Sequence, residues 1–184
     1  EPRTLKGWKS QDLYARVREA RADAPRFIFH DGPPYANGDI HVGHLMNKVL
    51  KDLVVRSQLM EGRWCGFVPG WDCHGLPIEH RVMGELVESG RIEKIAALDA
   101  DQRRMAVRRE CRKYAEKFLK RQRGQMESLL TFADYGDPYL TMSPDYEGAT
   151  LEVLADLLDQ GLVYRDLKPV HWSLENRTAL AEAE

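Results

Sequence analysis

The chain has 184 residues, 43% of them hydrophobic and 30% charged, which is typical of one sizeable globular domain and excludes a disordered or membrane-embedded chain. The formal net charge of −2 argues against a protein that holds nucleic acid over its whole surface, so any RNA contact is expected to be regional. The sequence has no apolar run of the ~20 residues that cross a bilayer and no signal-peptide layout.

The cysteine pattern favours a reducing compartment. The three cysteines, Cys65, Cys73 and Cys111, include no C-x-x-C pair, which indicates neither a disulfide framework nor a zinc ribbon. We therefore expect a cytoplasmic protein. The chain begins at Glu1 without Met and stops inside a helix-like run at 178–184, and we expect it to be part of something longer.

The first 80 residues predict a strand, a loop, a helix and a second strand. A charged helix is expected at 10–24, ending at Pro25. The β-branched and aromatic run RFIFH at 26–30 predicts a buried strand, and the apolar stripe of 42–60 predicts a helix that packs on a sheet. A second strand is expected at 66–68. This order forms a βαβ unit, so the predicted fold class is α/β with a parallel sheet.

The second half of the sequence is predicted to be mainly helical. Helices are expected at 78–89, 101–130 and 147–160, the last closed by Gly161, with a loop at 134–144 and short strands at 162–164 and 170–172. The expected organisation is an N-terminal extension at 1–25, the βαβ unit with two signature loops at 26–80, a mainly helical part at 81–161, and return strands at 162–184.

The strongest chemical signal is the run HDGPPYANGDIHVGH at 30–44. Its glycines 32, 38 and 43 let the backbone approach a ligand closely, and the run opens a helix whose N-terminal amides favour phosphate. His41 and His44 lie on one face of the first turn, where two imidazoles can donate hydrogen bonds to phosphate oxygens. The pattern predicts a phosphate clamp; the alternative is a helix cap with a satisfied polar contact.

Two other roles for these residues, a metal site and a thiolate nucleophile, have less support from the sequence. A metal site at His41 and His44 needs a third ligand, for which Asp31 or His74 is available, but no ligand spacing supports it. Cys73 beside His74 suggests a thiolate nucleophile, yet sequence neighbours point to different sides and no partner base is identifiable. A buried, inert thiol is favoured.

A second loop, GWDCHGLPIE at 70–79, follows a predicted strand, where open α/β folds place ligand groups. Its Asp72 can meet a cation such as the ammonium group of a free amino acid. The alternative is an Asx turn or a helix cap, and spacing alone favours that alternative.

A basic stretch on the helix expected at 101–130 could contact an RNA backbone. Charged runs on long helices are more often solvated faces, which is the favoured alternative. The residues are Arg103, Arg104, Arg108, Arg109, Arg112, Lys113, Lys117, Lys120, Arg121 and Arg123.

Five segments occur in one order along the chain: HDGPPYANGDIHVGH, PGWDCHGLPIE, DPYLTM, KPVHW and TALAEAE. In this combination the chain resembles the N-terminal catalytic part of the isoleucyl-tRNA synthetases, a class I aminoacyl-tRNA synthetase family. The relatives for valine, leucine and methionine share the H-x-G-H signature but differ in the second segment. Nucleotidylyltransferases share the histidine-glycine-histidine start and lack the second segment, which makes them a distant alternative.

The resemblance implies a Rossmann-like parallel sheet with helical insertions, and a parent that activates isoleucine with ATP and Mg²⁺ and transfers it to tRNA(Ile). It implies that His41 and His44 stabilise charge on the phosphates, that Gly43 lies under the adenine, that Gly32 and Pro33 line the amino-acid pocket, and that Asp72 holds the substrate ammonium. The ATP-binding residues it implies are Pro34, Tyr35, Ala36, Asn37, Gly38, Asp39, Ile40, His41, Val42, Gly43 and His44.

The resemblance also indicates what this chain lacks. The family's second ATP signature, a lysine-containing KMSKS loop, belongs to the other half of the catalytic fold, and the editing domain is inserted where this chain ends. Many relatives carry a C-x-x-C zinc pair where this sequence has Ser173 and Asn176, so no zinc is expected here. We expect the chain alone to be weakly active or inactive, an ATP- or RNA-binding half-domain being the alternative, and to self-associate through exposed apolar surface.

Overall fold

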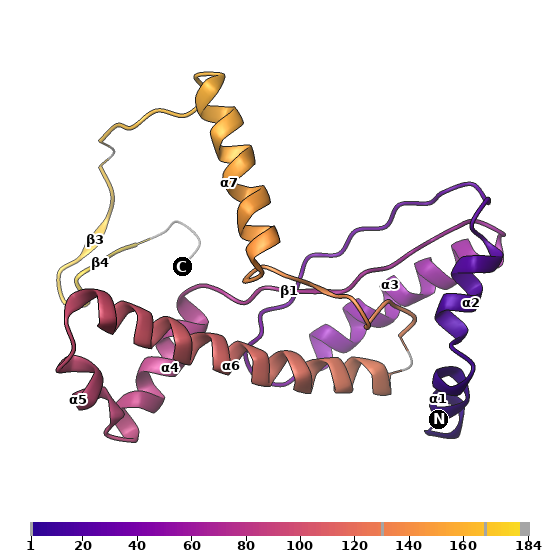
Figure 1. The fold of residues 1–184 in the computed structure, drawn as a ribbon, viewed down its shortest axis with the longest axis horizontal. Coiled ribbons are helices and arrows are strands. Elements are labelled where there is room, and N and C mark those ends of the chain that lie inside the picture. Colours follow the sequence, from indigo (N-terminus) through magenta and orange to yellow (C-terminus); the bar gives the residue numbers. More distant parts are fainter. Residues whose placement is uncertain (1, 130, 168, 181–184) are drawn as a thin grey trace. The chain divides into compact units, whose positions relative to one another are not determined.

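The computed structural model describes residues 2–129, 131–167 and 169–180 (Figure 1). The chain forms two compact units, Glu1–Glu147 and Gly148–Glu184, and each is described by itself. None of the described helices is long and apolar enough to cross a membrane.

Six helices lie wholly within the described part of the first unit: α1 (Pro2–Ser10), α2 (Leu13–Ala20), α3 (Val42–Met60), α4 (Leu76–Glu88), α5 (Arg91–Ala96) and α6 (Ala100–Ser128). The prediction for 42–60 is confirmed, and α4 and α6 begin within two residues of the predicted positions. The helix predicted at 10–24 is confirmed in its central part as α2 but is shorter at both ends, because the chain breaks at Asp12, which adopts a left-handed φ of 45°. The sequence did not predict α1 or α5.

A small parallel sheet brings the two signature loops together. The strand β1 (Gly70–Trp71) pairs in parallel with β2 (Tyr139–Leu140). The segment that contains β1 also makes two parallel bridges: Arg26 pairs with Trp64, and Tyr35 pairs with Asp72. The predicted parallel sheet is therefore confirmed, with residues 64–72 as its central segment. The loop predicted at 134–144 is wrong in part, because it contains β2.

The strands predicted at 26–30 and 66–68 do not form as such. In the first segment, pairing near its start is limited to the bonds of Phe27 N–H to Trp64 O (2.8 Å) and Trp64 N–H to Pro25 O (3.0 Å). At Phe67 the Tyr14 hydroxyl accepts from the backbone N–H (3.0 Å) and donates to the carbonyl (3.1 Å), which also accepts from the Asp134 N–H (2.8 Å). Helix α2 thus satisfies backbone groups that a ladder would otherwise pair.

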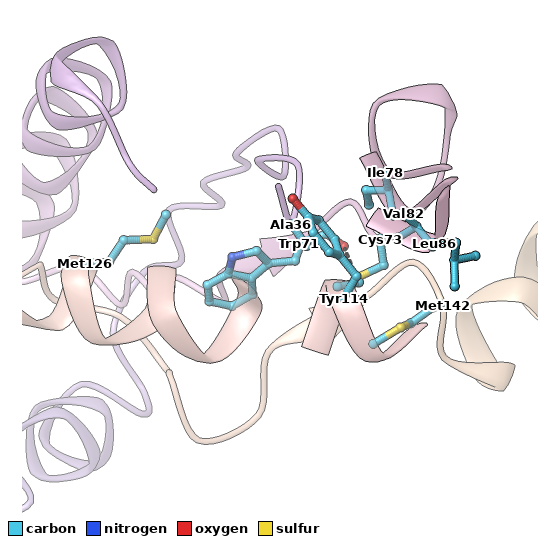
Figure 2. Close-up of a cluster of buried hydrophobic side chains, with 10 residues drawn as sticks. Ala36, Trp71, Cys73, Ile78, Val82, Leu86, Tyr114, Met126 and Met142 are labelled. Carbon is cyan, nitrogen blue, oxygen red and sulfur yellow. Dashed lines mark hydrogen bonds between the residues drawn. The ribbon is translucent and has the colours of Figure 1, made fainter. Parts of the chain in front are cut away.

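Two apolar cores hold the first unit. The first joins the sheet to α4 and α6 (Figure 2) and comprises Ala36, Trp71, Cys73, Ile78, Val82, Leu86, Tyr114, Ala115, Met126 and Met142. The second comprises Val55, Cys65, Phe67, Phe132 and Ala133, with Leu13, Tyr14 and Val17 of α2 packed against it. The first core holds the middle of the signature loop through Ala36 and Ile40, and the second anchors α2 on α3.

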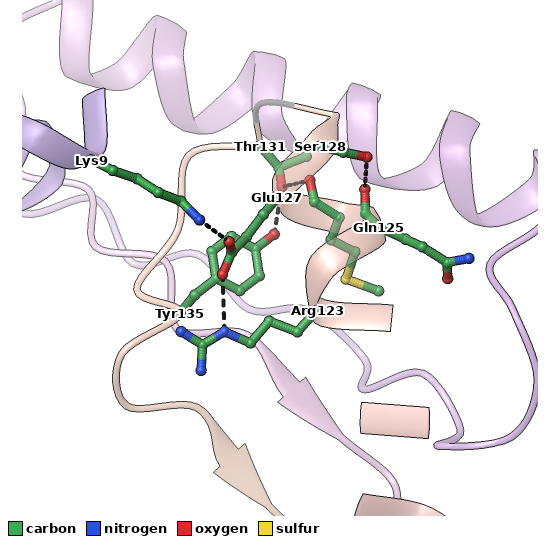
Figure 3. A network of polar contacts seen from close by, with 8 residues as sticks. Lys9, Arg123, Gln125, Glu127, Ser128, Thr131 and Tyr135 are labelled. Atoms are coloured by element: carbon green, nitrogen blue, oxygen red, sulfur yellow. Dashed lines mark hydrogen bonds and ion pairs between the residues drawn. The ribbon is translucent and has the colours of Figure 1, made fainter. Parts of the chain in front are cut away.

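A polar network ties α1 to the end of α6 (Figure 3). Glu127 pairs with Lys9 of α1 and with Arg123, whose Nε lies 2.9 Å from Oε1. Next to it the hydroxyls of Thr131 and Tyr135 share a hydrogen bond. Burial raises the pKa of Tyr135 to about 12, so this hydroxyl stays protonated at neutral pH.

The second unit contains most of α7 (Pro144–Asp159) and a short antiparallel pair, β3 (Trp172–Ser173) with β4 (Thr178–Ala179). The predicted helix at 147–160 is confirmed within three residues. The predicted strand at 170–172 overlaps β3, whereas 162–164 form no strand. The helix-like interpretation of 178–184 is wrong at 178–179, which are β4, and residues 181–184 lie outside the described part.

Candidate active site

The two signature histidines cap α3. His41 is the N-cap residue, and its Nδ1 accepts a hydrogen bond from the Gly43 N–H (3.1 Å). The Nδ1 of His44 accepts in turn from the His41 N–H (3.3 Å). The ring centroids lie 4.0 Å apart. The helix-cap alternative is thus confirmed, and it uses only one nitrogen of each ring.

The cap determines what the other nitrogens can do. Because both Nδ1 atoms accept backbone protons, each neutral ring carries its own proton on Nε2. Desolvation, the neighbouring His41 and Lys48 lower the pKa of His44, so its imidazole is neutral at pH 7. The arrangement leaves Nε2–H groups at a helix N-terminus, which can donate hydrogen bonds to an anion there.

Helix α6 supports the backbone of the signature loop. Gln122 is fully buried, and its Nε2 donates to the carbonyls of Tyr35 and Gly38, both at 2.9 Å. Its Oε1 accepts from the Trp71 indole N–H at 2.9 Å. One side chain therefore fixes the first loop against the strand that carries the second loop.

Further contacts hold the loop side chains. The Gln125 amide accepts from the Ile40 N–H (3.2 Å) and donates to Asp39 (2.7 Å), and Arg121 also binds the Asp39 carboxylate (2.6 Å). The Asn37 Oδ1 accepts from the hydroxyl of Tyr114 (2.8 Å). Asn37 and Asp39 are thus held to the protein by their side chains, whereas the hydrogen bonds of the two histidine rings to described residues all go to backbone within the cap.

This role of α6 was not predicted from the sequence. We interpreted the helix as an insertion with a basic face, and part of that basic charge proves to be paired: Arg104 with Asp101, Arg112 with Glu116, Lys113 with Glu110, Arg121 with Asp39, and Arg123 with Glu127. The sequence nevertheless carries a signal for a buried Gln122. Gln122 lies four residues after Phe118 and four before Met126, on the apolar stripe of the helix, where an amide needs buried partners.

Three glycines are needed, Gly43 and Gly70 for steric reasons and Gly38 for its backbone conformation. A Cβ on Gly43 would lie 2.9 Å from Cε1 of the capping His41, and Gly38 has a left-handed φ of 77°. A Cβ on Gly70 would lie 2.0 Å from the ring of Tyr139, the residue opposite it in the β1–β2 pair. The Tyr139 hydroxyl donates to the carbonyl of Asp31 (3.2 Å), a contact that the sequence did not indicate.

Asp72 joins the second loop to the first. Its N–H donates to the Pro34 carbonyl and its carbonyl accepts from the Ala36 N–H, both at 2.8 Å. Its Oδ1 accepts from the His74 N–H (3.2 Å) and from the Thr141 hydroxyl (3.4 Å), so the Asx-turn alternative is confirmed. Among the described residues, no hydrogen bond engages Oδ2, which leaves one carboxylate oxygen for a cation. Gly32 and Pro33 directly precede the bonded Pro34.

The metal and thiolate alternatives gain no support. Asp31 pairs with Lys48 and Lys51, and His74 pairs with Glu147 at 3.5 Å. Within residues 2–129, 131–167 and 169–180, no group of three His, Cys, Asp or Glu side chains is arranged to hold a metal. Burial raises the pKa of the Cys73 thiol, which therefore stays protonated and inert.

Comparison with known proteins places this geometry in a family. The family described as tRNA synthetases class I (I, L, M and V) matches residues 3–184. The isoleucine–tRNA ligase of Kosmotoga olearia is 48% identical over 184 residues, and that of Geobacter sulfurreducens is 46% identical over 184 residues. Each alignment covers 100% of this chain and 19% of the relative, so the chain spans about a fifth of the relatives' length.

A solved structure shares the fold. The chain is similar, with a TM-score of 0.70 and 23% identity, to the structure described as the ternary complex of Agrobacterium radiobacter K84 agnB2 LeuRS-tRNA-LeuAMS. That similarity covers 97% of this chain and 20% of the other. The fold is therefore that of a Rossmann-like class I synthetase fragment with helical insertions. On the family match, the chain belongs to the class I tRNA synthetases of the isoleucine, leucine, methionine and valine group.

Proposed function

We propose that this chain supplies the ATP- and amino-acid-binding part of an isoleucine–tRNA ligase that acts in the cytoplasm. The observation that carries the proposal is the pairing of the two loops: His41 and His44 present Nε2–H donors at the start of α3, and Asp72 is bonded through its backbone to Pro34 and Ala36 of the same signature segment. The names and the 48% and 46% identities of the relatives support isoleucine as the substrate.

The reaction follows from what these groups can bind. An oxygen of the isoleucine carboxylate attacks the α-phosphorus of ATP, pyrophosphate leaves, and isoleucyl-adenylate forms; the acyl group then passes to tRNA(Ile). Negative charge grows on the phosphate oxygens in the transition state, where the Nε2–H donors of His41 and His44 stabilise it. The free oxygen of Asp72 accepts the substrate ammonium. Mg²⁺ enters bound to ATP.

The remaining site residues bind and shape the substrates. The loop Pro34, Tyr35, Ala36, Asn37, Gly38, Asp39 and Ile40, with Val42 and Gly43 at the start of α3, surrounds the nucleotide. Gly43 lies under the adenine, where a side chain would block stacking; on the Cβ side of Gly43 the His41 ring already fills the space. Gly32 and Pro33 line the amino-acid pocket next to Asp72.

Pyrophosphate exchange tests the substrate assignment. The assay uses the protein encoded by the complete reading frame around these residues, with each of isoleucine, valine, leucine and methionine. We expect isoleucine to support the fastest exchange and valine, one methylene smaller, to be roughly 10- to 200-fold less efficient. Faster exchange with leucine or methionine than with isoleucine would contradict the assignment.

A second candidate is a binding module without turnover, favoured by the coverage of only 19% of each relative. Single-turnover formation of isoleucyl-adenylate by the 184-residue chain separates the two. Adenylate that disappears when His41 and His44 are replaced by alanine would refute the binding-only function. ATP binding without adenylate would support it, and we expect weak or no adenylate from this chain.

A further inference from the structure

A charge cluster of low exposure begins one helical turn after His44 on α3. His44, Lys48 and Lys51 are spaced i, i+4 and i+7 on α3 and so share one face of the helix. The Lys48 ammonium contacts Oδ2 of Asp31, and the Lys51 ammonium contacts Oδ1 of the same carboxylate. We call Asp31, Lys48 and Lys51 the lysine cluster.

The burial of this cluster is unusual for its helix. The side chains of Asp31 and Lys48 are 5% and 8% exposed, whereas the apolar Met46 and Leu50 on either side of Lys48 are 66% and 56% exposed. A lysine is rarely buried, because the desolvation of its charge has to be offset by a partner. Here Asp31 is that partner, and Tyr139 fixes the carbonyl of Asp31 from β2.

The cluster carries an excess of one positive charge. It holds two ammonium groups and one carboxylate, and the ion pairs of the described residues link neither lysine to a second acid. A charge held at low exposure is screened less by water and salt than one on the surface. It therefore acts at longer range on whatever binds at the N-terminus of α3.

We propose that the lysine cluster is a positioning element of the ATP site: its excess positive charge attracts the triphosphate and opposes a further positive charge on the adjacent His44, which serves as a hydrogen-bond donor. The attraction to ATP rests on the proposed function, whereas the effect on His44 does not. Lys48 and Lys51 act through His44 and through their field, so they are positioning residues and not catalytic ones.

The electrostatics at His44 agree with this role. Its pKa is lowered by desolvation first, then by His41 and by Lys48. The charged groups around it are His41 at the cap, Lys48 and Lys51 on its own helix, and Asp31 on the neighbouring extended segment; the Asp39–Arg121 pair joins the loop to α6. Loss of one lysine charge removes repulsion of the imidazolium, so the pKa of His44 must rise.

The first test is an NMR titration of the histidine rings in the 184-residue chain. We compare wild type with Lys48→Met, Lys48→Arg and Lys51→Met, and use Lys94→Met as the matched control because Lys94 is exposed on α5. The expected result is a rise of about half a pH unit in the His44 midpoint for Lys48→Met, and a smaller rise for Lys51→Met, because Lys51 lies one turn further from His44 and is more exposed. Lys48→Arg and Lys94→Met should leave it near the wild-type value.

The second test is ATP binding at pH 6.5, 7.25 and 8, expressed at each pH as the ratio of variant to wild-type dissociation constant. The ratio cancels the titration of ATP itself. We expect Lys48→Met to weaken binding about fivefold at pH 8, and less at pH 6.5, because His44 there gains a proton that replaces the lost charge. A purely structural role would give a loss independent of pH.

Each outcome decides the proposal. An unchanged His44 midpoint in folded Lys48→Met, or equal losses of ATP affinity in Lys48→Met and Lys94→Met, overturns it. If Lys48→Met does not fold, Lys51→Met decides, because it removes the same charge and leaves the buried pair of Lys48 and Asp31. If wild type does not bind ATP, the proposed function of this chain fails, while the midpoint of His44 still decides the role of the cluster.

Discussion

Gly43 shows how the capping geometry constrains a single residue. The imidazole of His41 turns back over position 43 to accept the Gly43 N–H, so a Cβ there would lie 2.9 Å from Cε1. Real Cβ atoms do not approach that closely, and the ring would have to leave the cap. The glycine is therefore required by the cap itself, independently of any bound nucleotide.

Gly43→Ala should therefore displace His41 and cost about 1 kcal/mol of stability, the usual value of an N-cap, together with ATP affinity. The matched control is Gly84→Ala. Gly84 lies inside α4, and a methyl group added there would meet no atom within 4 Å, so this change should stabilise by roughly 0.5–1 kcal/mol. Urea unfolding of both variants checks the difference; equal effects would contradict the role given to Gly43.

Tyr135 predicts how stability depends on alkaline pH. Burial raises its pKa from 10 to about 12 in the folded chain. Between pH 10 and 12 the unfolded chain releases the phenol proton while the folded chain keeps it, so stability falls as pH rises through this window. The loss attributable to Tyr135 reaches about 2–3 kcal/mol.

Tyr135→Phe should flatten that fall, although it costs about 1 kcal/mol at neutral pH through the lost hydrogen bond to Thr131. Tyr164→Phe is the control, because Tyr164 is 83% exposed. Urea unfolding at pH 7, 10 and 11.5 measures both. An alkaline fall in Tyr135→Phe as steep as in Tyr164→Phe would contradict the assignment.

At the scale of elements, α6 determines the shape of the signature loop. Gln122 is fully buried and bonds the carbonyls of Tyr35 and Gly38 and the indole of Trp71. The loop thus owes its conformation to a residue more than 80 positions later in the sequence.

Gln122→Leu keeps the volume but leaves two carbonyls and one indole N–H without partners. We expect a loss of about 2–4 kcal/mol, since buried unpaired groups each cost on the order of 1–3 kcal/mol, and a weaker ATP site. Gln102→Leu on the exposed first turn of α6 should change stability by less than about 0.5 kcal/mol. A loss no larger for Gln122→Leu than for this control would show that the loop does not depend on α6.

The sequence predicted the elements whose signal is local. The helices α3, α4 and α6 follow from their own apolar spacing, and Asp72 was expected near the first loop because ligand groups follow parallel strands. The two-residue strands β1 and β2 carry too little pattern to be found, and pairing of Phe67 with the Tyr14 hydroxyl depends on a contact 53 residues away. The bonds of Gln122 and Tyr139 are likewise long-range. The histidines, glycines and Asp72 were singled out from local motifs, and their roles stay predictions; of their supports, Gln122 alone left a signal in its spacing on α6.

At the scale of the whole molecule, α3 presents a broad apolar face. Val42, Met46, Leu50 and Leu53 are 56–79% exposed, and the buried residues of the helix are Lys48 and Val55. Contiguous exposed apolar side chains on this scale mark a surface that associates with something.

The isolated chain should therefore self-associate at micromolar concentration, and the double variant Met46→Lys, Leu50→Lys should reduce that association. A matched variant, Lys6→Glu and Lys94→Glu, alters two exposed charges without touching this face. Sedimentation velocity over a hundredfold range of concentration measures the effect. A wild-type chain that stays monomeric throughout would refute the exposed-face prediction.

We propose that the capped histidine pair of this chain binds the phosphates of ATP. Calorimetric titration of the 184-residue chain with MgATP tests that role most directly. The decisive variant is His41→Ser with His44→Ala, because serine keeps an oxygen for the helix cap while both Nε2–H donors are lost. His80→Ala, on the exposed face of α4, is the control. We predict binding by wild type and by His80→Ala, and at least a tenfold loss, about 1.4 kcal/mol, in the double variant; equal affinity in all three chains would contradict it.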